Sequence, residues 1–135
     1  MGLKYSTSRR PSPESVKRLY LFAHWASKRK LADIRRMIAH TPMFFTAWEG
    51  TKLIGMARCS SDFTFRAVLW DVIIDPEYTR QGVGSKLVRS ALRHPSLTRV
   101  ESFWLSTTDK QNFYKRFGFK LNSKNIMVLR KDGRS

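Results

Sequence analysis

The chain has 135 residues, of which 41% are hydrophobic, and this length and composition predict one folded domain over residues 1–135. No apolar run approaches the roughly 20 residues that a membrane-spanning helix needs, so we expect no membrane association through a spanning segment. Cys59 is the only cysteine, which excludes an intramolecular disulfide and a cysteine-rich zinc site. We therefore expect no metal and a cytoplasmic location.

The formal net charge is +16, from 26 basic and 10 acidic residues, and such a surface attracts polyanions. The basic residues are spread along the chain, with local groups only at Lys28–Lys30 and at Arg35 and Arg36. Nucleic-acid contact and a generally basic surface both fit this distribution. Charge alone does not decide the function.

The N-terminal part predicts a short strand near Leu3–Ser6 and then two helices. Ser12 supplies a capping hydroxyl, and Pro13 suits the first helical position. Apolar residues then recur at three- and four-residue spacing, first after Pro13 and again from Leu31. Pro42 ends the second helix.

The middle of the chain predicts strands. Met43–Glu49 and Leu53–Cys59 are β-like runs joined through Gly50, so they should form an antiparallel pair. Ala67–Ile74 is almost wholly apolar, which predicts a central strand buried on both faces.

The remaining predicted elements are, in chain order, a helix over Gly82–Arg93, a strand over Val100–Ser106, a short helix from Asp109 to Phe117 stopped by Gly118, and a final strand over Ile126–Arg130. This order predicts an α+β fold. Its centre should be a mixed, mostly antiparallel sheet, flanked by about four helices.

The segment Asp71–Lys86 carries the clearest signal for chemistry, because an apolar strand leads through a proline turn into a glycine-flanked helix start. Gly82 and Gly84 let the backbone come close to a phosphate, and the free N–H groups and helix dipole favour an anion there. The other interpretation is that the glycines only tighten a strand-to-helix turn. The pattern of a P-loop is absent from the segment.

Residues 79–84 resemble the pyrophosphate-binding motif of the GNAT superfamily of N-acetyltransferases, Gln/Arg-x-x-Gly-x-Gly/Ala, with Thr79 at the Gln/Arg position. A second motif, Phe-Tyr-x-x-x-Gly-Phe, matches residues 113–119. The N-terminal half is similar to a small subgroup from bacteria and plastids. Some members of that subgroup acetylate arylalkylamines such as serotonin, or protein amines.

The resemblance implies an N-acetyltransferase that uses acetyl-CoA as cosubstrate and moves the acetyl group to a primary amine by direct transfer in a ternary complex. It implies that Val72, Ile73 and Ile74 offer backbone hydrogen bonds to the pantetheine arm. It also implies that the pyrophosphate is held by the backbone N–H groups of Arg80, Gln81, Gly82, Val83, Gly84 and Ser85.

Two residues are candidates for proton transfer. In the family, the tyrosine at the position of Tyr114 protonates the departing thiolate, and a phenol can serve as that acid. Asp71 is the candidate base that deprotonates the amine, because it lies within an apolar strand beside the expected thioester; a water relay is the alternative. The structural interpretations are a core aromatic for Tyr114 and an ion pair with Arg58 for Asp71.

The acceptor and the partners stay open at this stage. Five aromatic residues could line an acceptor pocket or belong to the core: Trp25, Phe45, Trp48, Phe63 and Trp70. A homodimer is compatible with the resemblance. A function of another class is a basic module on the same fold that binds nucleic acid or an acidic partner.

Overall fold

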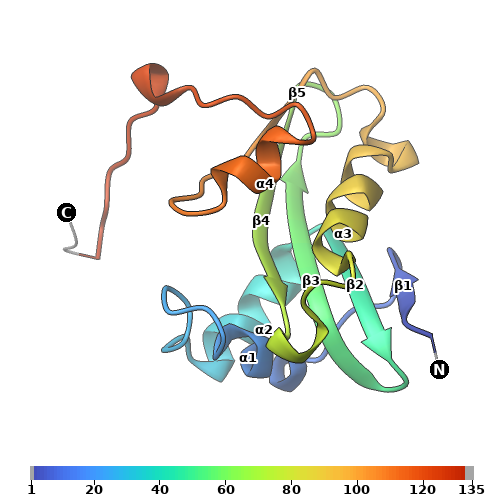
Figure 1. Cartoon of the computed structure of the whole chain (residues 1–135). Coiled ribbons are helices and arrows are strands. Elements are labelled where there is room, and N and C mark those ends of the chain that lie inside the picture. The colour runs from blue at the N-terminus through green and yellow to red at the C-terminus, as the bar shows by residue number, and fades with distance from the viewer. Residues whose placement is uncertain (1, 133–135) are drawn as a thin grey trace.

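A computed structural model describes residues 2–132, and Figure 1 labels its helices and strands. The elements in chain order are β1 (Lys4–Ser6), α1 (Pro13–Tyr20), α2 (Leu31–His40), β2 (Met43–Glu49), β3 (Lys52–Ser61), β4 (Arg66–Ile74), η1 (Pro76–Tyr78), α3 (Val83–Leu92), η2 (Pro95–Leu97), β5 (Ser102–Trp104), α4 (Gln111–Lys115) and η3 (Ser123–Asn125). None of the helices between residues 2 and 132 has the length and apolar character to cross a bilayer.

The strands form one sheet in the order β1-β2-β3-β4-β5. Neighbouring strands are antiparallel except β4 and β5, which are parallel. The predicted α+β fold, with a mostly antiparallel mixed sheet and helices around it, is confirmed.

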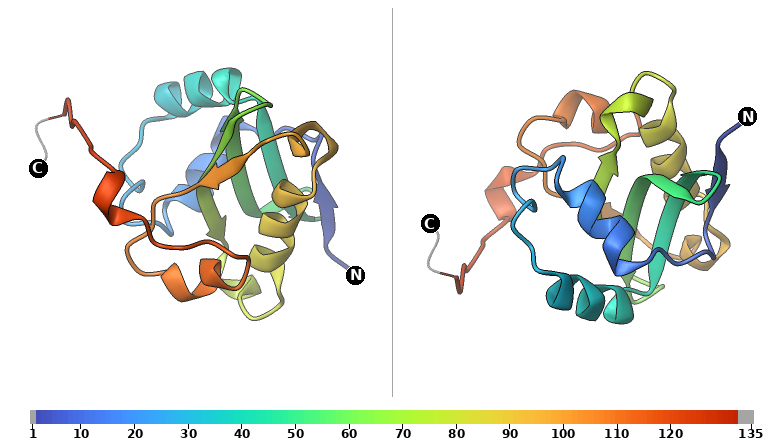
Figure 2. Two further views of the ribbon diagram at one scale, coloured as in Figure 1. Left: turned by 90° about the horizontal axis from the view of Figure 1, so that it is seen from above. Right: turned by 90° about the horizontal axis from the view of Figure 1, so that it is seen from below.

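Two apolar cores lie on opposite faces of the sheet. The two views of Figure 2 show helices on both faces of the sheet. Alternating side chains of β2 illustrate the division. Phe45 and Ala47 pack under α3 and α4, whereas Phe44 and Trp48 pack against α1 and α2. The sheet is therefore covered on both faces where β2 and β3 lie.

Local signals in the sequence place most of the element boundaries. The Ser12 hydroxyl accepts a hydrogen bond from the Ser15 amide at 3.1 Å and so caps α1. Gly50, in the β2–β3 turn, has φ 59°, and Gly118, after α4, has φ 95°, both in the left-handed region that favours glycine. The predictions of these caps and turns are confirmed.

The prediction that β4 is buried on both faces is wrong. Trp70 is 39% exposed, and Val68 and Asp71 are only partly buried. The strand order explains this, because β3 occupies the middle of the sheet and β4 lies next to the edge strand. An apolar run alone cannot distinguish these positions.

The predictions for the C-terminal quarter need correction. Ile126–Arg130 forms no strand, because no other strand of the described chain lies beside it, and Figure 1 shows this segment leaving the body. β5 is shorter than predicted, and so is α4. Asp109 does not cap α4: the position before the helix is Lys110, whose amide donates to the Thr107 hydroxyl at 3.1 Å.

Gly55 lets α3 pack closely on β3. A Cβ added at Gly55 would lie 3.0 Å from Val83 Cγ1 and 3.1 Å from Ile74 Cδ1. Because overpacking displaces such neighbours, we expect Gly55→Ala to lower the free energy of unfolding by about 1–3 kcal/mol in a urea titration. Gly2→Ala is the control, since its added Cβ meets nothing within 4 Å. An unchanged midpoint for Gly55→Ala would contradict this account.

Candidate functional site

A β-bulge in β4 sets which side chains reach each face of the sheet. The register of β3 against β4 shifts between Met56 and Arg58, so Asp71 and Val72 together oppose one residue of β3. Asp71 has φ 51°, in the left-handed region that aspartate tolerates better than most residues. As a result the Asp71 side chain reaches α1, whereas Val72 packs against the core under α3 and α4.

The Asp71 carboxylate is 4% exposed and is surrounded by donors. Its Oδ2 accepts hydrogen bonds from Arg58 Nε at 2.6 Å, from Tyr20 Oη at 2.7 Å and from Arg29 at 3.4 Å. Burial, followed by the charge of Asp71, raises the pKa of Tyr20 to about 12. The ion pair between Arg58 and Asp71 is confirmed. The role of Asp71 as a base stays a prediction, and its Oδ1 forms no hydrogen bond within residues 2–132.

An open cavity of about 290 Å³ lies beside this carboxylate on the face of α1 and α2. It is lined by Tyr20, Arg29, Asp33, Ile34, Met37 and Arg58. Sequence reasoning missed Tyr20 and Arg29, which are 51 and 42 residues from Asp71 along the chain. No local pattern links such distant positions.

The five aromatic candidates lie in three different environments. Phe45 and Trp48 are core residues, and Phe63 lies in the turn before β4. Trp25 and Trp70 are exposed, and each ring lies near a guanidinium that binds Asp71, at 5.4 and 5.7 Å from the ring centre. Two aromatic surfaces therefore flank the bulge.

β4 and β5 pair only at the beginning of β4. Residues 66–68 pair with residues 102–104, and residues 69–74 have no strand neighbour on that side within the described chain. This open edge includes Val72, Ile73 and Ile74, the residues assigned to the pantetheine arm. Its backbone N–H and C=O groups are available to a ligand.

The loop before α3 presents backbone donors. Arg80 has φ 69° and Gly82 has φ 74°, and exposed Gln81 lies between them. Gly82 is the N-cap of α3 and has no side chain that could accept a hydrogen bond from the amides of the first turn. This turn also holds no acidic residue. The N–H groups of Val83–Ser85 thus keep their capacity to bind an anion. The Thr79 hydroxyl lies outside this set, since it donates to a local carbonyl at 3.0 Å.

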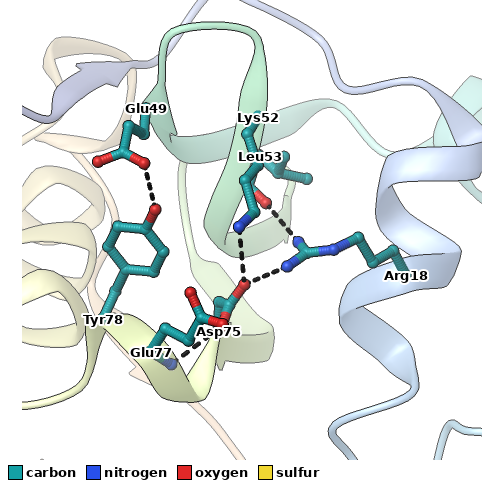
Figure 3. A network of polar contacts seen from close by, with 7 residues as sticks. All are labelled: Arg18, Glu49, Lys52, Leu53, Asp75, Glu77 and Tyr78. Carbon is teal, nitrogen blue, oxygen red and sulfur yellow. Dashed lines mark hydrogen bonds and ion pairs between the residues drawn. The ribbon is translucent and has the colours of Figure 1, made fainter.

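Asp75, at the end of β4, fixes the entry to this loop (Figure 3). Its buried carboxylate forms an ion pair with Arg18 of α1, lies 4.0 Å from Lys52 Nζ, and accepts the Glu77 amide at 3.0 Å. Arg18 also donates to the Leu53 carbonyl at 3.1 Å. Burial raises the pKa of Asp75, but the Glu77 amide and Arg18 outweigh it, so that the pKa lies below 3.8. Asp75 thus belongs to the turn that leads from β4 through η1 toward α3.

Tyr78, in η1, adds a second tie between this turn and the sheet. Its hydroxyl donates to the Glu49 carboxylate at the end of β2, as Figure 3 shows. This hydrogen bond is the main reason that the pKa of Tyr78 is raised to about 12. The loop before α3 is thus held by polar contacts to α1, β2 and β3.

Tyr114 lies in α4 on the same side of the sheet as α3. Its ring is buried in edge-to-face contact with Phe113 and Phe119, at centroid distances of 4.9 and 5.9 Å. Burial, followed by the charge of Asp109, raises the pKa of Tyr114 to about 12. The hydroxyl stays protonated at neutral pH and forms no hydrogen bond within residues 2–132.

A second open cavity, of about 670 Å³, runs along α3 from Gly82. Lys86, Arg89 and Arg93 contribute cations to its lining. The ion pairs that join two residues within 2–132 include none of these three cations, so no carboxylate neutralises them in that part of the chain. The surface next to the loop is therefore positive.

Cys59 lies in the core under α3 and α4. Burial raises the pKa of its thiol to about 11, so the thiol stays protonated at neutral pH. A core role fits this environment better than a nucleophilic one.

Comparison with known families gives one clear match. The model of the acetyltransferase (GNAT) family matches residues 5–119. Both predicted motifs lie within this range, and the C-terminal segment lies outside it.

Two plant proteins are similar in sequence. The GCN5-related N-acetyltransferase 2, chloroplastic, of Arabidopsis thaliana is 40% identical over 78 residues, which are 56% of this chain and 30% of that protein. The histone acetyltransferase TAP1 of Glycine max is 35% identical over 79 residues, which are 58% of this chain and 34% of that protein. The chain thus spans about one third of the length of these relatives.

A solved structure is similar over almost the whole chain. It is a protein of Xanthomonas campestris pv. campestris assigned to the GNAT acetyltransferase family, with 26% identity and a TM-score of 0.87. The match covers 98% of this chain and 96% of that chain.

Proposed function

The chain belongs to the acetyltransferase (GNAT) family, whose acetyl donor is acetyl-CoA, and we propose that it transfers the acetyl group to a primary amine by direct transfer in a ternary complex. The observation that carries this proposal is the continuity of two features. The open edge of β4 leads directly into the uncapped N-terminus of α3. A long ligand with a peptide-like arm and a pyrophosphate fits this arrangement.

In this proposal the coenzyme binds through the backbone. The edge formed by Val72, Ile73 and Ile74 bonds the pantetheine arm, and the N–H groups from Arg80 to Ser85 hold the pyrophosphate. The unneutralised cations along α3 attract the coenzyme's negative charge at long range. Thr79 stands where the family motif has Gln or Arg. The neighbouring Arg80 and Gln81 are exposed and can supply the phosphate contact of that side chain.

The two proton-transfer groups approach from opposite faces of the sheet. Tyr114 belongs to the core under α3 and α4, whereas the Asp71 carboxylate bonds Tyr20 on the other face. A thioester at the open edge of β4 would lie between them. The attacking amine would then enter from the side of α1 and α2, and the thiolate would leave toward Tyr114.

Binding of acetyl-CoA is the first test. We expect acetyl-CoA at about 100 times its Kd to stabilise the folded chain by about 2.7 kcal/mol, seen as a higher Tm in a thermal-shift titration. Acetyl-CoA should raise the Tm more than free acetate does at the same concentration. A Tm that does not move at millimolar acetyl-CoA would exclude the proposed activity.

The proposed base can be tested by Asp71→Asn. Asparagine can still accept hydrogen bonds from Tyr20 and Arg58 but cannot take a proton. We expect kcat/KM to fall by about 10²-fold or more. Glu14→Gln removes an exposed carboxylate at the start of α1 and is the control. An unchanged kcat/KM for Asp71→Asn would leave a water relay as the base.

We propose an arylalkylamine as the acceptor. Exposed Trp25 and Trp70 flank the bulge and offer stacking surfaces for an aryl group. The formal net charge of +16 repels a polycationic protein tail, so a small aryl amine is favoured over that protein acceptor. An assay that measures coenzyme A release with a panel of arylalkylamines, polyamines and basic peptides distinguishes these classes of acceptor. The family match favours this enzyme over the alternative of a basic binding module.

A further inference from the structure

The cavity of about 670 Å³ along α3, which we call the α3 groove, carries its cations on one face of the helix. Lys86, Arg89 and Arg93 follow one another at three- and four-residue spacing, so they form a single stripe, and all three are exposed. The other polar side chains of the lining are Thr7, Ser90 and His94. Within the described part of the chain, no carboxylate lines the groove. The surface is therefore both positive and polar.

The α3 groove lies on the flank of α3 that faces β1. Lys86 Nζ is 4.7 Å from the centre of the Tyr5 ring in β1, and Thr7 follows that strand. The opposite flank of α3 faces α4, where a Cβ added at Gly84 would lie 3.4 Å from Phe113 Cζ. Figures 1 and 2 show α3 between β1 and α4. Because β2 and β3 separate β1 from β4, the groove lies on the other side of α3 from the open edge of β4.

The charge of this stripe is not balanced by its surroundings. The sequence of α3, Val83–Leu92, contains no acidic residue. The ion pairs that join two residues within 2–132 use basic residues of α1, the α1–α2 loop and β3 instead. Exposed cations that are not compensated by carboxylates attract polyanions. The stripe can therefore serve a partner with several negative charges in a row.

The spacing of the cations fits the phosphates of a duplex. Lys86 and Arg93 lie about two helical turns apart, which is about 10 Å along the helix axis. One strand of a nucleic-acid duplex carries about three phosphates over that length. The lining residues within 2–132 include no Phe, Tyr or Trp on which unpaired bases could stack. This composition favours a duplex over a single strand.

We propose that the α3 groove binds the phosphate backbone of a nucleic-acid duplex, with Lys86, Arg89 and Arg93 on successive phosphates of one strand. His94 adds a donor, because its Nδ1 accepts the Ser96 amide at 3.1 Å and the neutral ring then carries its proton on Nε2. Contacts to phosphates do not read bases, so binding is independent of sequence. The proposal does not rest on acetyl transfer.

The first test is fluorescence anisotropy of a labelled, mixed-sequence DNA duplex of about 16 base pairs, titrated with the full chain between about 50 and 200 mM salt. We expect a micromolar Kd at the lowest salt and a slope of log affinity against log salt of about −3 or steeper. Replacing Arg89 and Arg93 together by glutamine should reduce the slope by about 2 and raise Kd about tenfold or more.

The matched control replaces Arg35 and Arg36 together by glutamine. These residues are exposed on α2, which covers the other face of the sheet, so the control loses the same charge away from the groove. Its Kd should stay within about twofold of the wild-type value. Replacing Arg89 and Arg93 by lysine retains both charges and should retain most of the slope. Circular dichroism and Tm should show that all three double variants are folded.

Competition distinguishes the α3 groove from the proposed coenzyme site. Saturating acetyl-CoA should leave the Kd for the duplex within about threefold. Polyglutamate of similar net charge should bind more weakly than the duplex, because its carboxylates do not have the phosphate spacing. Absence of duplex binding at low salt, equal losses in the two glutamine variants, displacement of the duplex by acetyl-CoA, or equal binding of polyglutamate would each overturn the proposal.

Discussion

Replacing Asp75 by asparagine is expected to lower the free energy of unfolding by about 2–3 kcal/mol. The buried carboxylate joins α1, β3 and the turn before α3, and asparagine retains its shape without its charge. Breaking a fully buried ion pair costs about 3–5 kcal/mol. The Arg18 side chain is 38% exposed and can be solvated, so we expect the smaller loss of about 2–3 kcal/mol. Urea unfolding at pH 7 measures the difference.

The same substitution should weaken acetyl-CoA binding, because Asp75 fixes the entry to the loop whose amides we propose as the pyrophosphate site. We expect Kd to rise by about tenfold, measured by calorimetry well below the Tm of the variant. Glu77→Gln is the control: it keeps the backbone amide that Asp75 bonds and changes only an exposed side chain. Equal effects of the two substitutions would contradict a specific role of Asp75.

The effect of Asp75 should depend on pH in a defined direction. Its pKa in the folded state lies below the ordinary 3.8, so the charged form is stabilised by folding. This contribution is complete above about pH 5 and is lost as the pH falls through the folded-state pKa. The stability difference between the wild-type chain and Asp75→Asn should therefore shrink below pH 4, which acid titrations in urea can follow.

Tyr114→Phe is expected to lower kcat by about 10²-fold or more while leaving the Kd for acetyl-CoA within about twofold. Phenylalanine keeps the edge-to-face contacts with Phe113 and Phe119 and removes only the hydroxyl. In the proposed mechanism the departing thiolate then has no proton donor. Steady-state kinetics with the acceptor found in the panel, together with direct binding of acetyl-CoA, separates the two quantities.

Tyr5→Phe is the matched control for Tyr114→Phe, because it removes a phenolic hydroxyl on β1 and leaves the ring that Lys86 contacts. Its kcat should equal that of the wild-type chain. The pKa of Tyr114, about 12, predicts no loss of rate from its deprotonation between pH 7 and about 10. Unchanged kcat for Tyr114→Phe would remove this residue from the mechanism.

Much of the fold could be predicted because its signals are local. The helix that begins after Ser12, the turn at Gly50 and the glycines around α3 depend on the conformational preferences of neighbouring residues. The same locality explains why the loop from Arg80 to Ser85 could be proposed as an anion site from the sequence. Its donors are consecutive backbone amides, whose positions follow from the helix start.

The partners of Asp71 could not be predicted in the same way. The bulge that turns this carboxylate toward α1 depends on the register of two strands, and Tyr20 and Arg29 reach it from another part of the chain. The sequence suggested only the pair with Arg58, which lies on the neighbouring strand. The choice between a base and a structural carboxylate thus rests on non-local geometry.

The sequence by itself determined the element order from β1 to α4, the strand-to-helix turn at Gly82 and the pair of motifs typical of the family, because each is encoded in short runs of residues. Only the tertiary structure decided which apolar runs are covered. Ala67–Ile74 and Ile126–Arg130 both have the sequence pattern of strands, yet the first is partly exposed next to the sheet edge and the second has no strand beside it within residues 2–132. Burial and pairing require a neighbour, and neighbours are set by the packing of the whole chain.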